Sequence, residues 1–294
     1  MKESYIVLKD GRKLGFEDSG PSNGFPIFLL HGTPGSRICE LNNESIITRK
    51  NLRIITPERP GYGLSDPLPQ RTIKDFSYDI EQLADKLNIE MFHVAGVSGG
   101  GPYTLACAYY LPNRVLSATL ISSAVPCNMS NFSKGMSAGN KLSFFVALHI
   151  PFLLRPLYYY SARVLLKNPD KLIEGIKPQL CPWDQEVLNE LEANGKLDMF
   201  ISHIREAYAQ GSKGVYSDTI LLTKPWDIKF EDIQVPIYMW HGKSDTLMPI
   251  EPAIEFSKLL PNCESSFIDN AGHLLLDDEK MSHIITNKII DIFA

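Results

Sequence analysis

The sequence predicts an α/β fold built on a mostly parallel β-sheet. Strand-like and helix-like runs alternate between residues 26 and 121, and this alternation resumes near Pro236. Alternation of this kind is typical of parallel strands joined by right-handed helical crossovers. A third observation is local: a glycine-flanked serine, Ser98, directly follows one strand-like run and precedes a helix-like one. Turns between strand and helix are where sheets of this class collect their functional groups.

The individual elements follow from residue patterns along the chain. Residues 4–18 are predicted to form a hairpin, because Asp10-Gly11 is a favourable turn dipeptide. Residues 72–88 carry apolar side chains at i, i+3 and i+4 spacing, which predicts an amphipathic helix. Further strands are expected over residues 26–31, 53–56, 91–95, 115–121, 236–240 and 265–268, and further helices over about 37–50, 100–111 and 276–293.

The region of about 127–231 breaks this alternation. It shows helical periodicity, many prolines and no convincing strand, so we expect a helical cap inserted after the sixth strand, between core segments 1–126 and 232–294. Its most apolar run, residues 143–156, is interrupted by a histidine, a proline and an arginine. A membrane span would need about 20 apolar residues, so cap helices with an apolar face are the better interpretation. The aromatic residues expected to add apolar surface are Tyr158, Tyr159, Tyr160, Trp183 and Trp226.

The most informative motif of the chain is Gly96-Val97-Ser98-Gly99-Gly100. A G-x-S-x-G turn between a strand and a helix holds its serine in a sharp, strained elbow, with the hydroxyl above the sheet. The outer glycines leave room in this tight turn because they carry no Cβ. Pro102 suits the first turn of the helix that follows, where its missing N–H costs nothing. Ser98 is therefore the predicted nucleophile.

A serine nucleophile needs a base to accept its proton and an acid to orient that base. His273 lies on a loop after the last strand, and Asp245 follows the strand before it. The order Ser98…Asp245…His273 is the one expected for this type of elbow. The other histidines, expected to be structural, are His31, His93, His149, His203, His241 and His283. The competing acids, which either precede the strand or share a short connection with His273, are Asp227, Asp232 and Asp269.

Attack of a serine on a carbonyl creates an oxyanion, which needs preorganised N–H donors. The backbone N–H of Gly99, directly after the nucleophile and at the start of its helix, is one expected donor. The second donor should come from a loop after an earlier strand, and the run His31-Gly32-Thr33-Pro34 follows the strand at 26–31. Proline has no N–H to donate, so Thr33 is the expected source.

These motifs together resemble the α/β-hydrolase-fold serine hydrolase superfamily, in its branch of carboxylesterases and proline-iminopeptidase-like enzymes with a helical cap. The resemblance covers nearly the whole chain and implies an eight-stranded, mostly parallel sheet flanked by helices. The sister groups that carry an aspartate at the elbow, haloalkane dehalogenases and epoxide hydrolases, fit less well because this chain has Ser98. The stretches that carry the resemblance are the elbow, His31-Gly32-Thr33-Pro34-Gly35-Ser36, Arg59-Pro60-Gly61-Tyr62-Gly63-Leu64-Ser65, His241-Gly242-Lys243-Ser244-Asp245 and Gly272-His273.

The function expected from these features is hydrolysis of a small, largely hydrophobic ester through an acyl-enzyme intermediate. One alternative is a proline-iminopeptidase-like aminopeptidase or amidase, which would need carboxylates near the pocket to bind the substrate ammonium. Proline iminopeptidases typically have glycine where Thr33 stands and tryptophan where Gly99 stands, so the chain departs from them there. Another alternative is a ligand-sensing protein with little turnover. The acidic cap residues considered for the aminopeptidase are Glu174, Glu186, Glu190, Glu192 and Asp198.

Composition fits a globular protein that acts on a small-molecule substrate. The 294 residues are 44% hydrophobic and 21% charged, with a net charge of −5. This charge favours neither a nucleic-acid partner nor stable membrane insertion, and the mechanism needs no metal or organic cofactor. Five scattered cysteines and an N-terminus without an apolar signal segment predict a cytoplasmic protein. We expect a monomer or homodimer.

Overall fold

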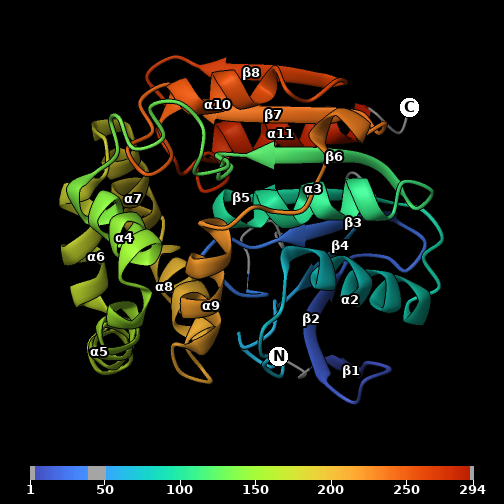
Figure 1. Ribbon diagram of the computed structural model, residues 1–294, viewed down its shortest axis with the longest axis horizontal. Helices are drawn as coiled ribbons and strands as arrows, with labels where there is room; N and C mark the ends of the chain where they lie inside the picture. The colour runs from blue at the N-terminus through green and yellow to red at the C-terminus, as the bar shows by residue number, and fades with distance from the viewer. Residues whose placement is uncertain (1–3, 39–50, 292–294) are drawn as a thin grey trace.

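The computed structural model of the protein describes residues 4–38 and 51–291. Its centre is one sheet of eight strands in the order β1-β2-β4-β3-β5-β6-β7-β8 (Figure 1). Strands β4, β3, β5, β6, β7 and β8 lie side by side in this order and pair in parallel. Strands β1 and β2 continue the sheet beyond β4 in antiparallel pairing. The predicted eight-stranded, mostly parallel sheet is thereby confirmed. The strands are β1 (Tyr5–Val7), β2 (Lys13–Ser19), β3 (Phe25–Leu30), β4 (Leu52–Pro57), β5 (Phe92–Val97), β6 (Val115–Ile121), β7 (Ile237–Gly242) and β8 (Cys263–Ile268).

In the part of the chain that the structure describes, four helices flank the sheet on its two faces. One apolar core lies between the sheet and helices α2, α3 and α10, and a second lies between the sheet and α11. Neighbouring residues of β3 enter opposite cores, Phe28 the first and Leu29 the second, because successive strand side chains point to opposite faces. The flanking helices are α2 (Ile73–Lys86), α3 (Gly101–Tyr110), α10 (Ile250–Ser257) and α11 (Glu279–Asp291).

The local predictions agree with the elements of the structure. The N-terminal hairpin forms with Asp10-Gly11 in its turn. Helix α2 begins after Thr72, whose hydroxyl accepts the N–H of Asp75 while the Asp75 carboxylate accepts the N–H of Thr72. Its predicted apolar stripe is buried against the sheet. The helix expected near 37–50 lies, from residue 39 onward, outside the described residues.

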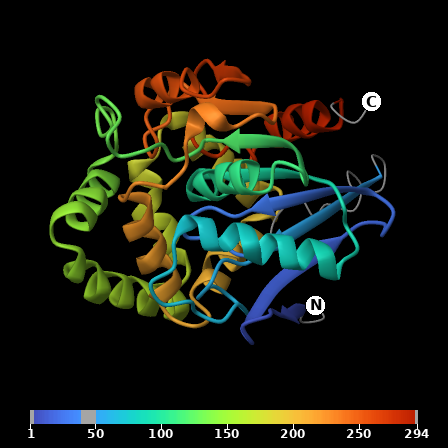
Figure 2. The ribbon, with the colours of Figure 1, turned by 45° about the vertical axis from the view of Figure 1, so that its right-hand side comes forward.

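Between β6 and β7 the described chain forms helices and no strand, as its periodicity predicts. Figure 1 shows these helices beside the edge toward which the β6 arrow points, and Figure 2 shows α4 and α5 at the outer rim. The elements are α4 (Ala138–His149), η3 (Pro151–Leu153), α5 (Leu154–Lys167), α6 (Asp170–Ile176), η4 (Lys177–Gln179), α7 (Pro182–Ala193), α8 (Leu197–Ala207), α9 (Lys213–Leu222) and η5 (Phe230–Asp232).

The apolar side chains of this helical region are divided between its interior and its surface. Phe144 and Leu154 are buried, whereas Phe145 and Phe152 of the same run are exposed. Trp226 packs with aromatic rings of the main core rather than over the sheet edge. The expectation that Trp226 adds apolar surface to this helical region is therefore not met, because its ring is buried in the main core. No helix of the described residues is long and apolar enough to cross a membrane.

Candidate active site

The residues predicted to act in catalysis all follow carboxyl ends of parallel strands. Thr33 lies on the loop after β3, and Ser98 lies directly after β5. Asp245 follows β7, and His273 follows β8. Because carboxyl ends of parallel strands meet at one edge of a sheet, the topology directs all four toward the same edge.

Ser98 occupies a strained backbone position at the junction of strand and helix. Its φ is +52°, in the left-handed region that residues with a Cβ rarely adopt. The short 3₁₀ turn η2 (Ser98–Gly100) leads directly into α3, and Ser98 is half-buried. Cβ atoms built on Gly96 and Gly100 would approach their neighbours to 2.2 and 2.3 Å, so the crowding expected around the elbow is present.

His273 and Asp245 form a buried hydrogen-bonded pair. His273 Nδ1 donates to Asp245 Oδ2 at 2.7 Å. The other carboxylate oxygen, Oδ1, accepts the backbone N–H groups of Leu247 at 2.7 Å and Met248 at 2.8 Å. Because Nδ1 carries the proton, Nε2 of the neutral ring is an acceptor. Among the described residues, no hydrogen bond joins His273 to Ser98.

The electrostatics of this pair favour an ionised carboxylate beside a basic imidazole. Burial alone would lower the pKa of His273, but attraction to Asp245 and the hydrogen bond between them raise it above its ordinary value. Burial alone would raise the pKa of Asp245, yet the neighbouring His273 and the backbone N–H of Met248 bring it below its ordinary value. The arrangement therefore stabilises a proton on the imidazole.

The structure separates the preferred residues from two competitors. His241 Nε2 lies 3.5 Å from Asp245 Oδ2, but its N–H donates to the carbonyl of Met248 at 2.7 Å. The His241 side chain is wholly buried, and burial lowers its pKa, so this ring differs from His273 in both its hydrogen-bond partner and the direction of its pKa shift. Asp269 is exposed and pairs with Lys243 at 2.7 Å, away from His273. Asp245 is the acid that contacts His273.

The two residues expected to supply N–H donors are neighbours in space. A Cβ built on Gly99 would lie 2.4 Å from Thr33 Oγ1 and 3.3 Å from Thr33 N. A Cβ built on Gly32 would lie 3.6 Å from Ser98 Cβ, so the loop after β3 passes directly beside the elbow. This proximity is what a pair of donors facing one oxygen atom would require.

Comparison with known proteins identifies the family. A family model described as "alpha/beta hydrolase fold" matches residues 26–280. The chain belongs to this family. A solved thermophilic esterase from Thermogutta terrifontis is similar to the hydrolase with a TM-score of 0.70 and 21% identity, and the match covers 100% of both chains.

Curated relatives of the hydrolase carry several functional names. A non-heme chloroperoxidase from Streptomyces lividans is 23% identical, over 92% of this chain and 93% of the relative. A proline iminopeptidase from Neisseria gonorrhoeae is also 23% identical, over 93% of this chain and 90% of the relative. The match to the alpha/beta hydrolase family over residues 26–280 supports a hydrolase activity for this chain.

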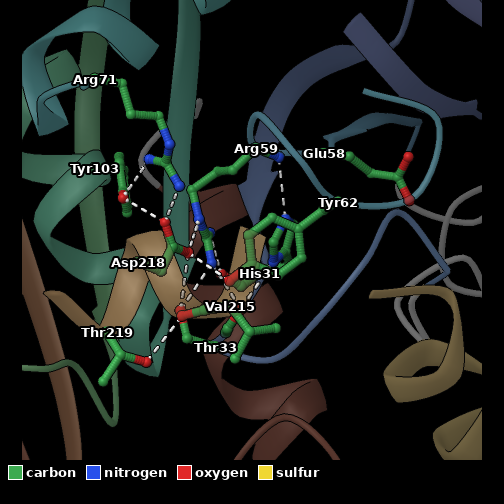
Figure 3. A network of polar contacts seen from close by, with 12 residues as sticks. His31, Thr33, Glu58, Arg59, Tyr62, Arg71, Tyr103, Val215, Asp218 and Thr219 are labelled. Atoms are coloured by element: carbon green, nitrogen blue, oxygen red, sulfur yellow. Dashed lines mark hydrogen bonds and ion pairs between the residues drawn. The ribbon is translucent and has the colours of Figure 1, made fainter. Parts of the chain in front are cut away.

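The hydrolase also contains a buried polar network that the sequence analysis did not identify (Figure 3). Asp218 of α9 is at its centre and is fully buried. The groups that donate to its carboxylate are Thr33 Oγ1 at 3.1 Å, Arg59 Nε at 2.7 Å, Tyr62 Oη at 2.8 Å, Tyr103 Oη at 2.7 Å and Arg71 Nη2. Burial would raise the pKa of Asp218, but the two arginines keep it far below its ordinary value.

A second carboxylate of the helical region contacts the loop that carries His273. Asp184, in the first turn of α7, accepts the N–H of Leu274 at 2.9 Å through Oδ1. A Cβ built on Gly272 would lie 2.3 Å from the same carboxylate, so glycine permits this close approach. The helical periodicity of the sequence could have shown that Asp184 is buried. It lies three, four and seven residues before buried apolar side chains and therefore on the same face of the helix.

Proposed function

We propose that this hydrolase cleaves a carboxylic ester with Ser98 as nucleophile, His273 as base and Asp245 as the orienting acid. The observation that supports this most directly is the buried 2.7 Å hydrogen bond from His273 Nδ1 to Asp245. It leaves Nε2 as the acceptor, which is the atom that must take the serine proton. The strained Ser98 at the same sheet edge is the corresponding nucleophile.

The proposed reaction has two steps. In the first, Ser98 Oγ bonds to the ester carbonyl carbon while its proton moves to His273 Nε2. The bond from that carbon to the alkoxide then breaks, and the alkoxide leaves with the proton from His273. In the second step, His273 takes a proton from water, whose oxygen attacks the acyl-enzyme. Return of this proton to Ser98 Oγ releases the carboxylic acid and restores the enzyme.

The oxyanion of each step is proposed to bind the backbone N–H groups of Gly99 and Thr33. Their close approach supports this assignment, and so does the place of Gly99 at the amino end of η2 and α3. The free N–H groups at a helix N-terminus form the positive end of the helix dipole, which favours a negative charge beside them. Preorganised donors of this kind often contribute the largest part of the rate enhancement.

We also propose that residues 127–231 act as a cap over a core of residues 1–126 and 232–294. Two contacts from this region to the site loops support a cap. Asp218 binds the hydroxyl of Thr33 at 3.1 Å, and Asp184 binds the N–H of Leu274 at 2.9 Å. A helical cover rich in apolar residues would exclude water and suit a largely hydrophobic acyl or alcohol group.

An aminopeptidase is the second candidate because curated relatives include proline iminopeptidases over 93% of this chain. That activity needs an unpaired carboxylate to bind the substrate ammonium. The five acidic residues considered for this role in the sequence are all exposed. Asp184 and Asp218 are buried, but each already accepts hydrogen bonds from the protein. Ester hydrolysis therefore remains the preferred proposal.

The two candidates are distinguished by measuring hydrolysis of p-nitrophenyl esters of increasing acyl length beside hydrolysis of proline 2-naphthylamide. We expect turnover of the esters and little turnover of the amide. Activity on the amide alone would overturn the ester proposal in favour of the aminopeptidase. Ser98→Ala is measured in parallel, and any turnover that it retains is subtracted as the activity of a contaminating hydrolase.

A further inference from the structure

The guanidinium of Arg59 is bonded to three successive residues of the loop after β3. Nη1 donates to the carbonyl of His31 at 2.5 Å, and Nη2 donates to the carbonyl of Gly32 at 2.7 Å. Nη2 also donates to Thr33 Oγ1 at 3.0 Å. The planar fork of one arginine therefore fixes the backbone of the loop that carries the proposed oxyanion donor.

One of these contacts acts on the donor itself. The carbonyl of Gly32 and the N–H of Thr33 belong to the same peptide unit, which is planar. A charged donor on the carbonyl side therefore holds the orientation of the N–H on the other side. It also polarises the peptide, because hydrogen bonds in series strengthen one another in a buried site.

Arg59 is in turn held from the helical region. Its Nε donates to Asp218 Oδ2 at 2.7 Å, and both side chains are 0% exposed. Asp218 is part of α9, 159 residues further along the chain. The same oxygen accepts from Thr33 Oγ1, so the carboxylate contacts both the arginine and the residue that the arginine orients (Figure 3).

We propose that Arg59 is a positioning residue that orients the Thr33 N–H through the Gly32 carbonyl, and that Asp218 of α9 holds Arg59 in this role. The inference rests on the proposed function, since it assigns Thr33 to the oxyanion hole. In this proposal, α9 supports the oxyanion hole through the contact of Asp218 with Arg59. Loss of the Arg59–Asp218 contact weakens transition-state stabilisation while ground-state binding of the substrate is kept.

Arg59→Lys is the primary test because it keeps the buried positive charge and removes the fork. Arg53→Lys is the matched control: Arg53 is also buried and binds a carboxylate, that of Asp18, through two nitrogens. It lies near the amino end of β4, at the edge of the sheet opposite the site. Asp218→Asn is the second variant, with Asp79→Asn as its control, since Asp79 is a buried partner of Arg12.

The measurements are kcat and KM on a p-nitrophenyl ester, normalised to active sites titrated with a fluorophosphonate, and inhibition by an alkyl boronic acid. We expect Arg59→Lys to lower kcat about 10²-fold, the scale of a misplaced catalytic group, with KM within about 3-fold. Affinity for the boronic acid, which forms a tetrahedral adduct on the serine, should fall with kcat. The acid limb of the pH profile should stay in place, because His273 is not altered.

A change confined to stability, with kcat per titrated site and boronic acid affinity unchanged, would assign a purely structural role to Arg59 and overturn the inference. Should Asp218→Asn fail to fold, Arg59→Lys alone decides the matter. A wild-type enzyme without Ser98-dependent turnover would overturn the proposed function itself and this inference with it. An active wild type beside fully active variants would overturn this inference alone.

Discussion

The carboxylate of Asp184 contacts the loop that carries His273 and accepts the N–H of the next residue, Leu274, at 2.9 Å. The imidazole thus lies near two buried carboxylates on different elements, because Asp245 also accepts its Nδ1–H at 2.7 Å. Both negative charges raise the pKa of His273 against the effect of burial. One of them comes from the helical region between β6 and β7, so this region influences the proposed base as well as the proposed oxyanion donor.

The pH profile should report this environment. A base must be neutral to accept a proton, so kcat/KM should rise with pH through a pKa above 6.5, the ordinary value for histidine. Asp184→Asn removes one of the charges that raise this pKa, so the acid limb should move to lower pH. Glu186→Gln, an exposed change on the same helix, is the control and should leave the limb in place. A shift toward higher pH in Asp184→Asn would contradict the electrostatic account.

Asp245→Asn should strongly reduce turnover while the fold is kept. The amide can still accept the N–H groups of Leu247 and Met248 through one oxygen. The NH₂ group of the asparagine would donate to Nδ1 of His273. This favours the tautomer with its proton on Nε2, which cannot accept the proton of Ser98. We expect kcat to fall by about 10⁴-fold, the loss known for this change in serine proteases. Steady-state kinetics and circular dichroism check both points, with Asp269→Asn as the control that should retain activity.

The fold could be predicted from the sequence because its signals are local. The Asp10-Gly11 turn, the apolar stripe of α2 and the glycine-flanked Ser98 each reflect a constraint that acts within a few residues. The expectation for the aromatic residues failed at Trp226, which packs against Phe256 of α10. Periodicity shows that a helix has an apolar face, but it does not show which element covers that face.

Gly99→Ala should lower activity through a steric clash. The added methyl would lie 2.4 Å from Thr33 Oγ1, so the loop after β3 would have to move away from the elbow. The two proposed oxyanion donors would separate, and we expect kcat to fall by about 10²-fold, the scale for loss of one such donor. Gly175→Ala, which meets no atom within 4 Å, is the matched control. Wild-type kcat in Gly99→Ala would exclude the close approach of the two loops as a catalytic requirement.

The triad candidates could also be predicted from the sequence, because each follows a strand and their order is characteristic of the elbow. The buried Arg59–Asp218 pair could not, since its members are 159 residues apart and meet only through the tertiary fold. A signal for Asp218 existed in its helix, where it lies three residues from both Val215 and Leu221, which are buried. That spacing places a charge on an apolar face, and such a charge requires a buried partner.

The measurement that tests the central claim most directly is labelling of the purified protein with a fluorophosphonate, followed by mass spectrometry of the modified peptide. The account predicts one adduct, on Ser98, formed faster as pH rises through the pKa of His273. Ser98→Ala should remain folded, take up no label and lose at least about 10⁴-fold in ester turnover. Labelling at another residue, or ester turnover that survives in Ser98→Ala, would contradict the account.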